Sequence, residues 1–287
     1  MQRWILGARP RTLPAAVVPV LVGTAVAAGS GIVWWRAAAA LVVALALQVA
    51  TNYANDLSDG IRGTDGEQRV GPVRLVGSGL ASLAEVRLAM LVAFAVAAVA
   101  GLALAVVVTP WLLVVGAASI VAGWLYTGGP RPYGYLGLGE VFVFTFFGLV
   151  ATVGSAYVHQ REVPVVAWPA AVAVGLLACA LLAVNNLRDR LGDEASGKRT
   201  LAVRLGDQRT RLLYVVLLGG ALVMGALCAV TRPWAAIVLL AGALAAPAVR
   251  RVVGGADGPE LIEVLGRTGH TQMVAGVLLA VGLALSA

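Results

Sequence analysis

The chain has 287 residues, of which 60% are hydrophobic and 12% are charged, and its formal net charge is +7. Soluble globular proteins carry roughly 25% charged residues. With a mean hydropathy of +0.90, the composition excludes an ordinary soluble domain and indicates a membrane protein. The net charge alone would also suit a nucleic-acid-binding protein. The positions of the charges, described below, argue against nucleic acid and for a lipid bilayer as the partner.

Cysteine and histidine do not form a metal-binding or disulfide pattern. Cys179 and Cys228 each lie in an apolar run, while His159 and His270 are far apart in unrelated contexts. We therefore interpret both cysteines as small buried hydrophobic residues.

Long apolar runs predict nine transmembrane helices, because a helix needs about 20 mostly apolar residues to cross a bilayer. The runs are rich in Ala, Val, Leu and Gly, and small residues favour close packing of helices in lipid. The predicted segments are residues 13–29, 37–54, 84–108, 111–126, 137–158, 165–186, 212–230, 233–249 and 270–286. We expect an all-α integral membrane protein in which residues 1–287 form one polytopic domain.

The first apolar run also resembles a secretory signal peptide, because it follows Arg3, Arg9 and Arg11. Pro14 and Pro19 interrupt the run, and many comparable runs follow it. A first transmembrane helix is the simpler interpretation.

Charged residues are distributed unequally between alternate loops. Of the 21 Lys and Arg residues, only Arg36, Arg161 and Arg232 fall on one side, and of the 14 Asp and Glu residues only Glu162 falls in a loop there. Cytoplasmic loops are enriched in Lys and Arg. In a bacterial plasma membrane, the N-terminus and the long polar loops are therefore expected in the cytoplasm, and the C-terminus, after nine helices, outside.

Two of the predicted cytoplasmic loops, residues 55–83 and 187–211, stand out by their length and polar content. Each follows a hydrophobic helix and opens with Asn and Asp. These two similar Asn/Asp segments lie at the ends of the second and sixth predicted helices. They suggest a weak internal repeat whose halves face each other across a central cavity.

The acidic residues of these loops are spaced for a metal site. Asp56 and Asp59 are three residues apart, and Asp189 and Asp193 are four apart. If the helices continue into the loops, each pair shares a helix face, where like charges repel. A divalent cation removes that repulsion, and Mg²⁺ is typically held by one or two carboxylates together with substrate phosphates and water. The four Asp residues are therefore candidate magnesium ligands and catalytic residues.

Basic residues in the same loops could neutralise a diphosphate, because Arg offers phosphate oxygens a bidentate fork and Lys a compact charge. They are Arg74, Arg188, Lys198 and Arg199. Any one charged loop residue is most often a solvated group or an orientation signal. Two such clusters at matching helix ends are much less expected by chance.

These two segments resemble the two Asp-rich motifs of the UbiA superfamily of intramembrane prenyltransferases. They read Asn52-x-x-Asn55-Asp56-x-x-Asp59-x-x-x-Gly63-x-Asp65 and Asn186-x-Arg188-Asp189-x-x-x-Asp193-x-x-x-Gly197-Lys198-Arg199-Thr200-Leu201. The resemblance spans nearly the whole chain. It implies nine transmembrane helices around a central cavity.

Further stretches resemble one branch of the superfamily, the 1,4-dihydroxy-2-naphthoate polyprenyltransferases of menaquinone synthesis. The hydroxybenzoate branch tends to place its third Asp two residues earlier, at the position of Gly63. The stretches are Gly63-x-Asp65, residues 70–79, Tyr126-Thr127-Gly128-Gly129-Pro130 with Tyr133, and the opening Ala8-Arg9-Pro10-Arg11-Thr12-Leu13-Pro14.

The resemblance implies a Mg²⁺-dependent transfer of a polyprenyl group from polyprenyl diphosphate to 1,4-dihydroxy-2-naphthoate, with loss of carbon dioxide, giving demethylmenaquinol. By position, it assigns magnesium to Asp56, Asp59, Asp189 and Asp193, support of the ions or the diphosphate to Asn52, Asn55, Asn186 and Asp65, and diphosphate binding to Arg74, Arg188, Lys198 and Arg199.

Three assignments have an equally ordinary alternative. Arg11 would contact the carboxylate of the acceptor, or serve only as a positive anchor at the membrane. Tyr126 and Tyr133 would line the acceptor pocket or stabilise an allylic cation through their π electrons. Both tyrosines also suit an interfacial aromatic belt.

Other functions stay open at this point. A related enzyme would use another acceptor, such as 4-hydroxybenzoate, homogentisate, a haem or a chlorophyllide, or would transfer a sugar phosphate to polyprenyl phosphate. A secondary transporter would carry its charged coupling residues near the membrane midplane, whereas here they cluster at one face.

Overall fold

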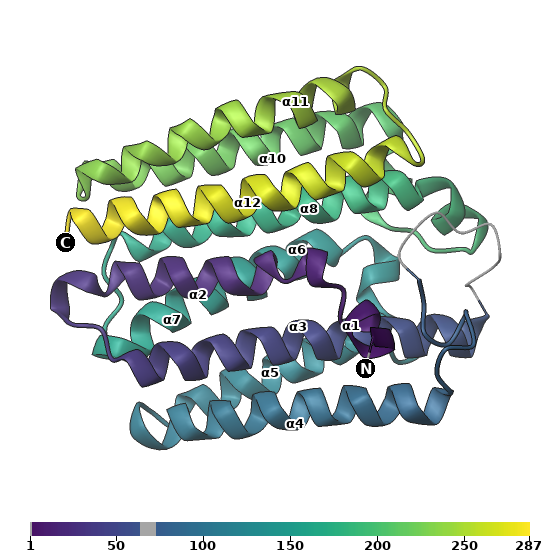
Figure 1. Cartoon of the computed structure of the whole chain (residues 1–287), viewed down its shortest axis with the longest axis horizontal. Helices are drawn as coiled ribbons and strands as arrows, with labels where there is room; N and C mark the ends of the chain where they lie inside the picture. Colours follow the sequence, from purple (N-terminus) through teal and green to yellow (C-terminus); the bar gives the residue numbers. More distant parts are fainter. Residues whose placement is uncertain (1, 64–72) are drawn as a thin grey trace.

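The computed structural model describes residues 2–63 and 73–287. Asp65 and residues 70–72, singled out above, lie outside the described residues. Within the described ranges every regular element is a helix. The long helices run side by side along one direction, and the ends of α3 (Trp34–Arg62) and α8 (Ala167–Ala195) lie at the right-hand end of the bundle in Figure 1.

The remaining elements follow in chain order. At the N-terminal side they are α1 (Gln2–Ala8), η1 (Pro10–Thr12), α2 (Pro14–Val26) and η2 (Ala28–Ser30). Between the first loop and α8 they are α4 (Leu83–Val107), α5 (Trp111–Leu125), η3 (Tyr133–Leu136), α6 (Gly139–Val143), the π-helical η4 (Phe144–Val150) and α7 (Ala151–Gln160). After α8 they are α9 (Leu201–Leu205), α10 (Asp207–Leu227), η5 (Cys228–Val230), η6 (Pro233–Leu240), α11 (Ala241–Val253) and α12 (Glu260–Leu285).

All nine predicted segments are helical, but the predicted count of nine membrane crossings is not confirmed. In the described ranges 7 helices are long and apolar enough to cross a membrane, or up to 8 if a bent pair near the N-terminus is one span. That pair, Gln2–Thr12 and Pro14–Val26, bends by 56° where proline interrupts the ladder of helical hydrogen bonds. α5 has 15 residues and is therefore about 22 Å long, shorter than the hydrocarbon core of about 30 Å.

The two Asn/Asp segments lie on helices and not in loops. The second and sixth predicted helices were expected to end near residues 54 and 186, but α3 continues to Arg62 and α8 to Ala195. α3 then ends at Gly63, which takes a φ of 64° and donates its N–H to the carbonyl of Asp59. Glycine adopts this left-handed conformation without strain. Because of these extra helical turns, Asp56 and Asp59 lie within α3, and Asp189 and Asp193 lie within α8.

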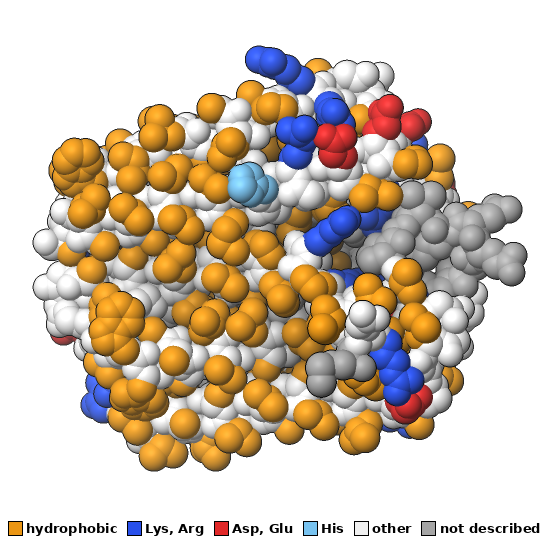
Figure 2. Space-filling model, viewed as in Figure 1, with side chains coloured by type: hydrophobic (Ala, Val, Ile, Leu, Met, Phe, Trp, Pro, Cys, Tyr) orange, Lys and Arg blue, Asp and Glu red, His pale blue; other side chains and the backbone are white. Residues whose placement is uncertain are grey.

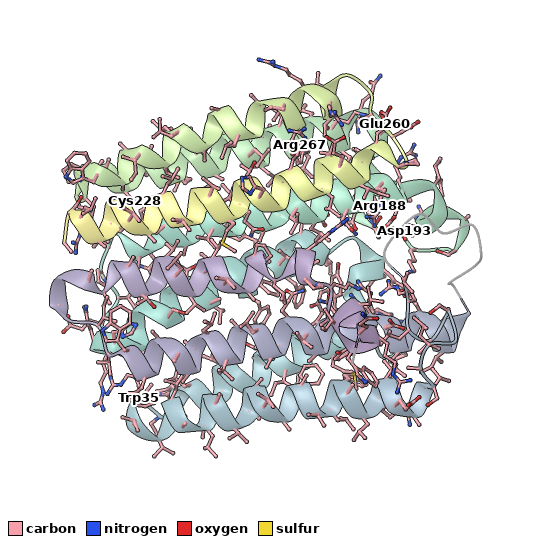
Figure 3. The ribbon with its side chains drawn as sticks, viewed as in Figure 1. Trp35, Arg188, Asp193, Cys228, Glu260 and Arg267 are labelled. Atoms are coloured by element: carbon pink, nitrogen blue, oxygen red, sulfur yellow. The ribbon has the colours of Figure 1, made fainter. Side chains whose placement is uncertain are left out.

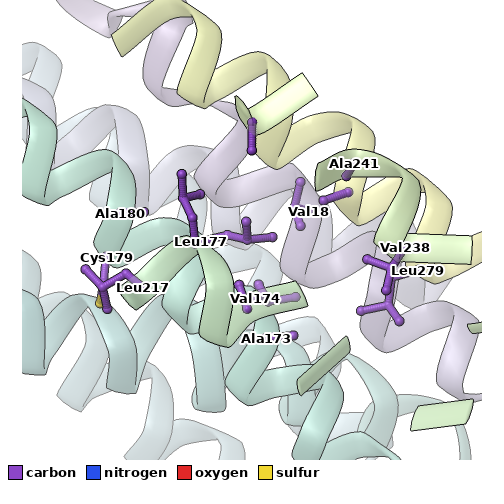
Figure 4. Close-up of a cluster of buried hydrophobic side chains, with 14 of the residues drawn as sticks. Val18, Ala173, Val174, Leu177, Cys179, Ala180, Leu217, Val238, Ala241 and Leu279 are labelled. Atoms are coloured by element: carbon purple, nitrogen blue, oxygen red, sulfur yellow. The ribbon is translucent and has the colours of Figure 1, made fainter. Parts of the chain in front are cut away.

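The main core forms where α2, α8 and α12 pack together. Figure 4 shows Val18 of α2, Val174 and Leu177 of α8, and Leu279 of α12 among the buried side chains of this cluster. Their aliphatic packing fixes the axis of α8, which carries the second Asn/Asp segment.

The outer surface separates apolar and charged side chains. Figure 2 shows hydrophobic side chains over most of the visible face, with most of the charged side chains at its right-hand end. In Figure 3, Trp35 and Asp193 lie at opposite ends of the bundle. More than half of the surface of four other tryptophans is exposed at that far end, as expected at a membrane–water interface; they are Trp34, Trp111, Trp168 and Trp234.

Candidate active site

A polar cavity of about 90 Å³ lies where the ends of α3 and α8 meet. Asn55 and Asp59 line it from α3, and Asp189 and Asp193 line it from α8. Figure 3 shows Arg188 and Asp193 at this end of the bundle. The two segments that echo each other in the sequence therefore face one shared space.

Asp59 is the centre of the charged contacts in this cavity. It is 1% exposed. One carboxylate oxygen accepts a hydrogen bond from Arg74 at 2.6 Å, and the other accepts from Lys198 at 3.1 Å and from Tyr135 at 2.9 Å. Because Arg74 follows α3 and Lys198 follows α8, these bonds hold the two loops together at Asp59.

The surroundings of Lys198 keep it charged. Burial alone would lower the pKa of Lys198, but the carboxylate of Asp59 and the nearby Tyr135 outweigh it and raise this pKa above its usual value. The ammonium also lies 4.8 Å from the centre of the Tyr135 ring, a favourable cation–π distance. Lys198 is therefore a permanent cation in the cavity at neutral pH.

Asp56 points to a different place from its neighbours in the motif. Its two carboxylate oxygens accept hydrogen bonds from the backbone N–H groups of Leu75 at 2.7 Å and Val76 at 3.0 Å. Such charge-assisted bonds are stronger than neutral ones. Asp56 thus anchors the stretch that carries Arg74 against α3, while Asn55 and Asp59, four residues apart, face the cavity.

Asp189, on α8, is more exposed than Asp59 and is paired with its neighbour in the chain. Arg188 donates to both oxygens of Asp189, at 2.8 and 2.7 Å, and to the side-chain oxygen of Asn185 at 3.0 Å. The side chain of Asp189 is 18% exposed, whereas that of Asp59 is 2% exposed. The backbone carbonyl of Asp193 accepts from the N–H of Lys198 at 2.8 Å, which positions Lys198 for its contact with Asp59.

The donor set suits a magnesium ion that is held together with a substrate. In the part of the chain that the structure describes, no three His, Cys, Asp or Glu side chains group closely enough to hold a metal alone. Mg²⁺ usually needs only one or two carboxylates when substrate phosphates and water complete its shell. The carboxylate and amide side chains that line this cavity are Asn55, Asp59, Asn185, Asn186, Asp189 and Asp193. Their hard oxygen atoms fit such an ion.

A second, apolar cavity of about 310 Å³ adjoins the polar one. Both cavities are lined by Arg9, Asn55, Tyr126 and Asn185. The apolar cavity continues along α3 as far as Ala40. Ala40 and Asn55 are fifteen residues apart, which corresponds to about 22 Å along a helix. Together the cavities form a charged chamber that continues into a deep hydrocarbon-like one.

Aromatic rings form one wall of the apolar cavity beside the polar one. Tyr126 and Tyr133 meet edge to face at 5.5 Å, and Tyr133 stacks on Phe142 at 3.7 Å. Phe146 continues the row at 6.1 Å from Phe142. The Tyr133 hydroxyl donates to the carbonyl of Ala122 at 2.7 Å, so this ring is held in place. Both predicted tyrosines therefore contribute to the wall of the apolar cavity.

Asn52 and Arg11 lie at the apolar cavity. Asn52 donates to the carbonyl of Ala8 at 2.8 Å and to the hydroxyl of Thr12 at 3.1 Å. It thereby ties the kinked N-terminal segment to α3. Arg11 is exposed and lines the cavity from the same segment.

Asn186 and Arg199 have different surroundings. Asn186 donates to the buried carboxylate of Glu140 at 3.0 Å and lines the polar cavity. The side chain of Arg199 is exposed, and within the described ranges it lines neither cavity. Its backbone N–H donates to the carbonyl of Tyr135 at 3.0 Å.

Several side chains that line the polar cavity were absent from the predicted site, among them Arg9, Tyr135 and Asn185. Arg9 lies where the N-terminal segment kinks and has a φ of 52°, a conformation that costs a non-glycine residue about 1–3 kcal/mol and is typical of functional sites. Arg9 could have been predicted, because it belongs to the same opening motif as Arg11. Tyr135 lies two residues after Tyr133, and nothing in its spacing distinguished it.

Comparisons with known proteins agree with this geometry. Residues 16–260 match the model of the UbiA prenyltransferase family. The chain is 50% identical over 283 residues to a Mycobacterium tuberculosis protein named 1,4-dihydroxy-2-naphthoate octaprenyltransferase, covering 98% of this chain and 97% of the relative. It is 37% identical to an Escherichia coli protein of the same name, covering 99% and 96%.

Solved structures show the same fold. A UbiA homologue from Archaeoglobus fulgidus, solved with GPP and Mg²⁺ bound, superimposes with a TM-score of 0.70 at 16% identity, covering 98% of this chain and 99% of that one. The fold, the matched family model and the identity to relatives over nearly their whole length lead to one conclusion. This chain is a multi-span membrane protein that belongs to the UbiA prenyltransferase family.

Proposed function

We propose that this protein transfers a polyprenyl group from polyprenyl diphosphate to 1,4-dihydroxy-2-naphthoate with loss of carbon dioxide, which gives demethylmenaquinol. The observation that carries the proposal is the junction of a charged cavity with a deep apolar one. A prenyl diphosphate has this same division, with an anionic head and a long hydrocarbon tail. The names of the relatives supply the acceptor.

The charged cavity would receive the diphosphate. Arg9, Arg74, Arg188 and Lys198 line it, and Arg and Lys are suited to phosphate oxygens. Arg74 and Lys198 now contact Asp59, and Arg188 contacts Asp189. When a metal diphosphate binds, the Arg and Lys side chains would bind the phosphate oxygens, and the Asp carboxylates would bind the metal.

Magnesium would be held by Asn55, Asp59, Asp189 and Asp193, with Asn186 close by. When bound, the ion supplies a Lewis acid that neutralises charge on the leaving diphosphate. For Asp56 we propose a supporting part in place of direct ligation. Among the described residues it does not line the polar cavity, and its oxygens face the backbone N–H groups of Leu75 and Val76.

In the proposed reaction the bond between the allylic carbon and the diphosphate oxygen breaks, and its electron pair leaves with the diphosphate. The naphthoate carbon that bears the carboxylate then donates an electron pair to the allylic cation. The alkylated ring then loses carbon dioxide, and tautomerisation of the ring ketone to the phenol restores the aromatic ring. The rings of Tyr126, Tyr133 and Phe142 would face the cation and stabilise it, while the apolar wall excludes water that would otherwise capture it.

The acceptor would enter from the apolar cavity beside the N-terminal kink. Arg11 lines that part of the cavity and is the proposed partner of the naphthoate carboxylate. The wall beside it is aromatic and apolar, which suits a flat bicyclic ring.

We further propose that residues 1–287 act as one domain with the charged cavity at the cytoplasmic face of a bacterial plasma membrane. Helices from both halves of the chain line the cavities, which supports a single unit. The excess of Lys and Arg in the loops at this end supports the orientation. Labelling of single cysteines at positions 36 and 199 in intact cells tests it, since a membrane-impermeant reagent should reach only position 36 from outside.

A transfer assay with purified protein in lipid tests the proposed function. Radiolabelled polyprenyl diphosphate would be supplied with 1,4-dihydroxy-2-naphthoate, 4-hydroxybenzoate or homogentisate, with Mg²⁺ or with a chelator. We expect a prenylated product from the naphthoate and Mg²⁺ only. Product from another ring would show that the acceptor is different but that the prenyl-transfer mechanism holds. If folded protein transfers the prenyl group to none of the rings, the proposal is contradicted.

A further inference from the structure

Two glycines widen the apolar cavity without any packing reason. Gly116 of α5 and Gly154 of α7 both line it. A Cβ atom added at either position would have no described atom within 4 Å. Glycine inside a helix is less stable than alanine by about 0.5–1 kcal/mol. The two positions therefore keep open space at the expense of helix stability.

At two other glycines nearby in the chain, an added Cβ atom would come too close to a neighbouring helix. Gly123 also lines the apolar cavity from α5, but a Cβ there would come within 2.8 Å of the Thr51 hydroxyl. At Gly148 of η4 a Cβ would come within 2.6 Å of the Cα of Gly175. Close approach of neighbouring helices explains these glycines, and it does not explain Gly116 or Gly154.

Both open glycines lie in the part of the cavity that is remote from the charged chamber. Gly116 precedes Gly123 by seven residues, which places it about 10 Å farther from Thr51 along α5. Gly154 lies five residues before His159, whose Nδ1 accepts from the N–H of Val33 beside the first turn of α3. Asp59 lies near the other end of that helix.

We propose that Gly116 and Gly154 determine the longest isoprenoid tail that the enzyme accepts. The inference rests on the proposed prenyl transfer, in which the charged cavity fixes the diphosphate. Every tail then enters the apolar cavity from one fixed point, and only a long tail reaches the depth of these two glycines. A side chain at either position would occupy that space and leave the room for a short tail unchanged.

The test is the ratio of affinities for a long and a short donor. Unlabelled octaprenyl and geranyl diphosphates would compete with radiolabelled farnesyl diphosphate for protein in nanodiscs with Mg²⁺, and transfer to the naphthoate would be measured in parallel. Gly116→Ala, Gly116→Leu, Gly116→Phe and Gly154→Leu form the series. We expect the preference for octaprenyl over geranyl diphosphate to fall progressively with side-chain size, by about tenfold or more for Gly116→Phe.

Gly219→Phe is the matched control. Gly219 lies on α10 and is exposed, and a Cβ atom added there would have no described atom within 4 Å. Within the described residues, it lines neither cavity. Its ratio should equal that of the wild type. Equal loss of both donors across the Gly116 series, or an unchanged ratio in every variant, would overturn the inference. If the wild-type protein binds both donors but prenylates no naphthoate, the proposed reaction fails, while the binding ratio still decides the role of the glycines.

Discussion

The ends of α3 and α8 have similar sequences but are held in different ways. On α3, Asp56 is bonded to two backbone N–H groups, and Asp59 is bonded to Arg74, Lys198 and Tyr135. On α8, the pairing partner of Asp189 is its own neighbour Arg188. The α3 end therefore organises the loops around the cavity, and the α8 end presents a more exposed carboxylate. Two motifs of similar sequence can thus have different structural roles in one site.

Removal of the Asp59 charge should have the largest effect. Asp59→Asn takes away the shared partner of two cations and a proposed magnesium ligand. We expect kcat/KM to fall by about 10²–10³-fold or more, as for the loss of other main electrostatic contacts in active sites. Steady-state transfer in nanodiscs measures it. Activity within a few-fold of the wild type would contradict the central position of Asp59.

Asp189→Asn should reduce transfer by about a hundredfold with little change in thermal stability, because Asp189 is partly exposed and forms its ion pair with the adjacent residue Arg188. Its higher exposure also predicts a direct effect on the metal. The concentration of Mg²⁺ that gives half-maximal rate should rise. A large fall in melting temperature with an unchanged Mg²⁺ requirement would show instead that Asp189 supports the fold.

Asp56→Asn should act on the loop and not on the metal. The amide retains one acceptor oxygen and places a donor against a backbone N–H, so we expect a loss of about 1–3 kcal/mol in stability. Hydrogen exchange at the amides of Leu75 and Val76 should become faster, while the Mg²⁺ requirement stays unchanged. Exchange at Val158, whose N–H lies in α7 far from this loop, is the internal control. Unchanged exchange at Leu75 and Val76 would remove the proposed anchoring role.

Arg199→Ala should have the smallest effect, within about twofold of the wild type, because surface substitutions seldom change a protein by more than about 0.5 kcal/mol. Arg188→Ala is its matched partner from the same region. It should lower the affinity for prenyl diphosphate strongly, since Arg188 lines the polar cavity and its side chain is 3% exposed. Equal effects of the two substitutions would mean that Arg199 reaches the diphosphate when substrate binds.

The helices and the identity of the two polar segments were predictable from sequence. Apolar runs identified all nine helical segments, and the spacing of Asn and Asp identified the two helix ends that face one cavity. The direction of Asp56 was not predictable, since it depends on where the backbone of Leu75 and Val76 returns to α3. Spacing along one helix holds no information about that distant contact.

The remaining differences have similar causes. The kink that brings Arg9 to both cavities depends on the packing of the N-terminal segment through Asn52, a contact between distant parts of the chain. The part of the chain that the structure describes has fewer candidate crossings than the nine predicted, because the first span is bent and α5 is short. Hydropathy measures how apolar a segment is and not whether its helix is straight. The open space at Gly116 and Gly154 also depends on neighbouring helices, so the composition of the runs could not separate these glycines from packing ones.

The central claim is that the ends of α3 and α8 hold one metal diphosphate together. A double-mutant cycle tests it most directly, with Mg²⁺-dependent binding of geranyl diphosphate measured for wild type, Asp59→Asn, Asp189→Asn and the double variant. If both carboxylates serve one ion, each single substitution should abolish most of the Mg²⁺-dependent affinity and the double variant should be scarcely worse, a coupling of about 0.5–3 kcal/mol or more. Fully additive losses would show that the two residues act at separate sites and would contradict the account.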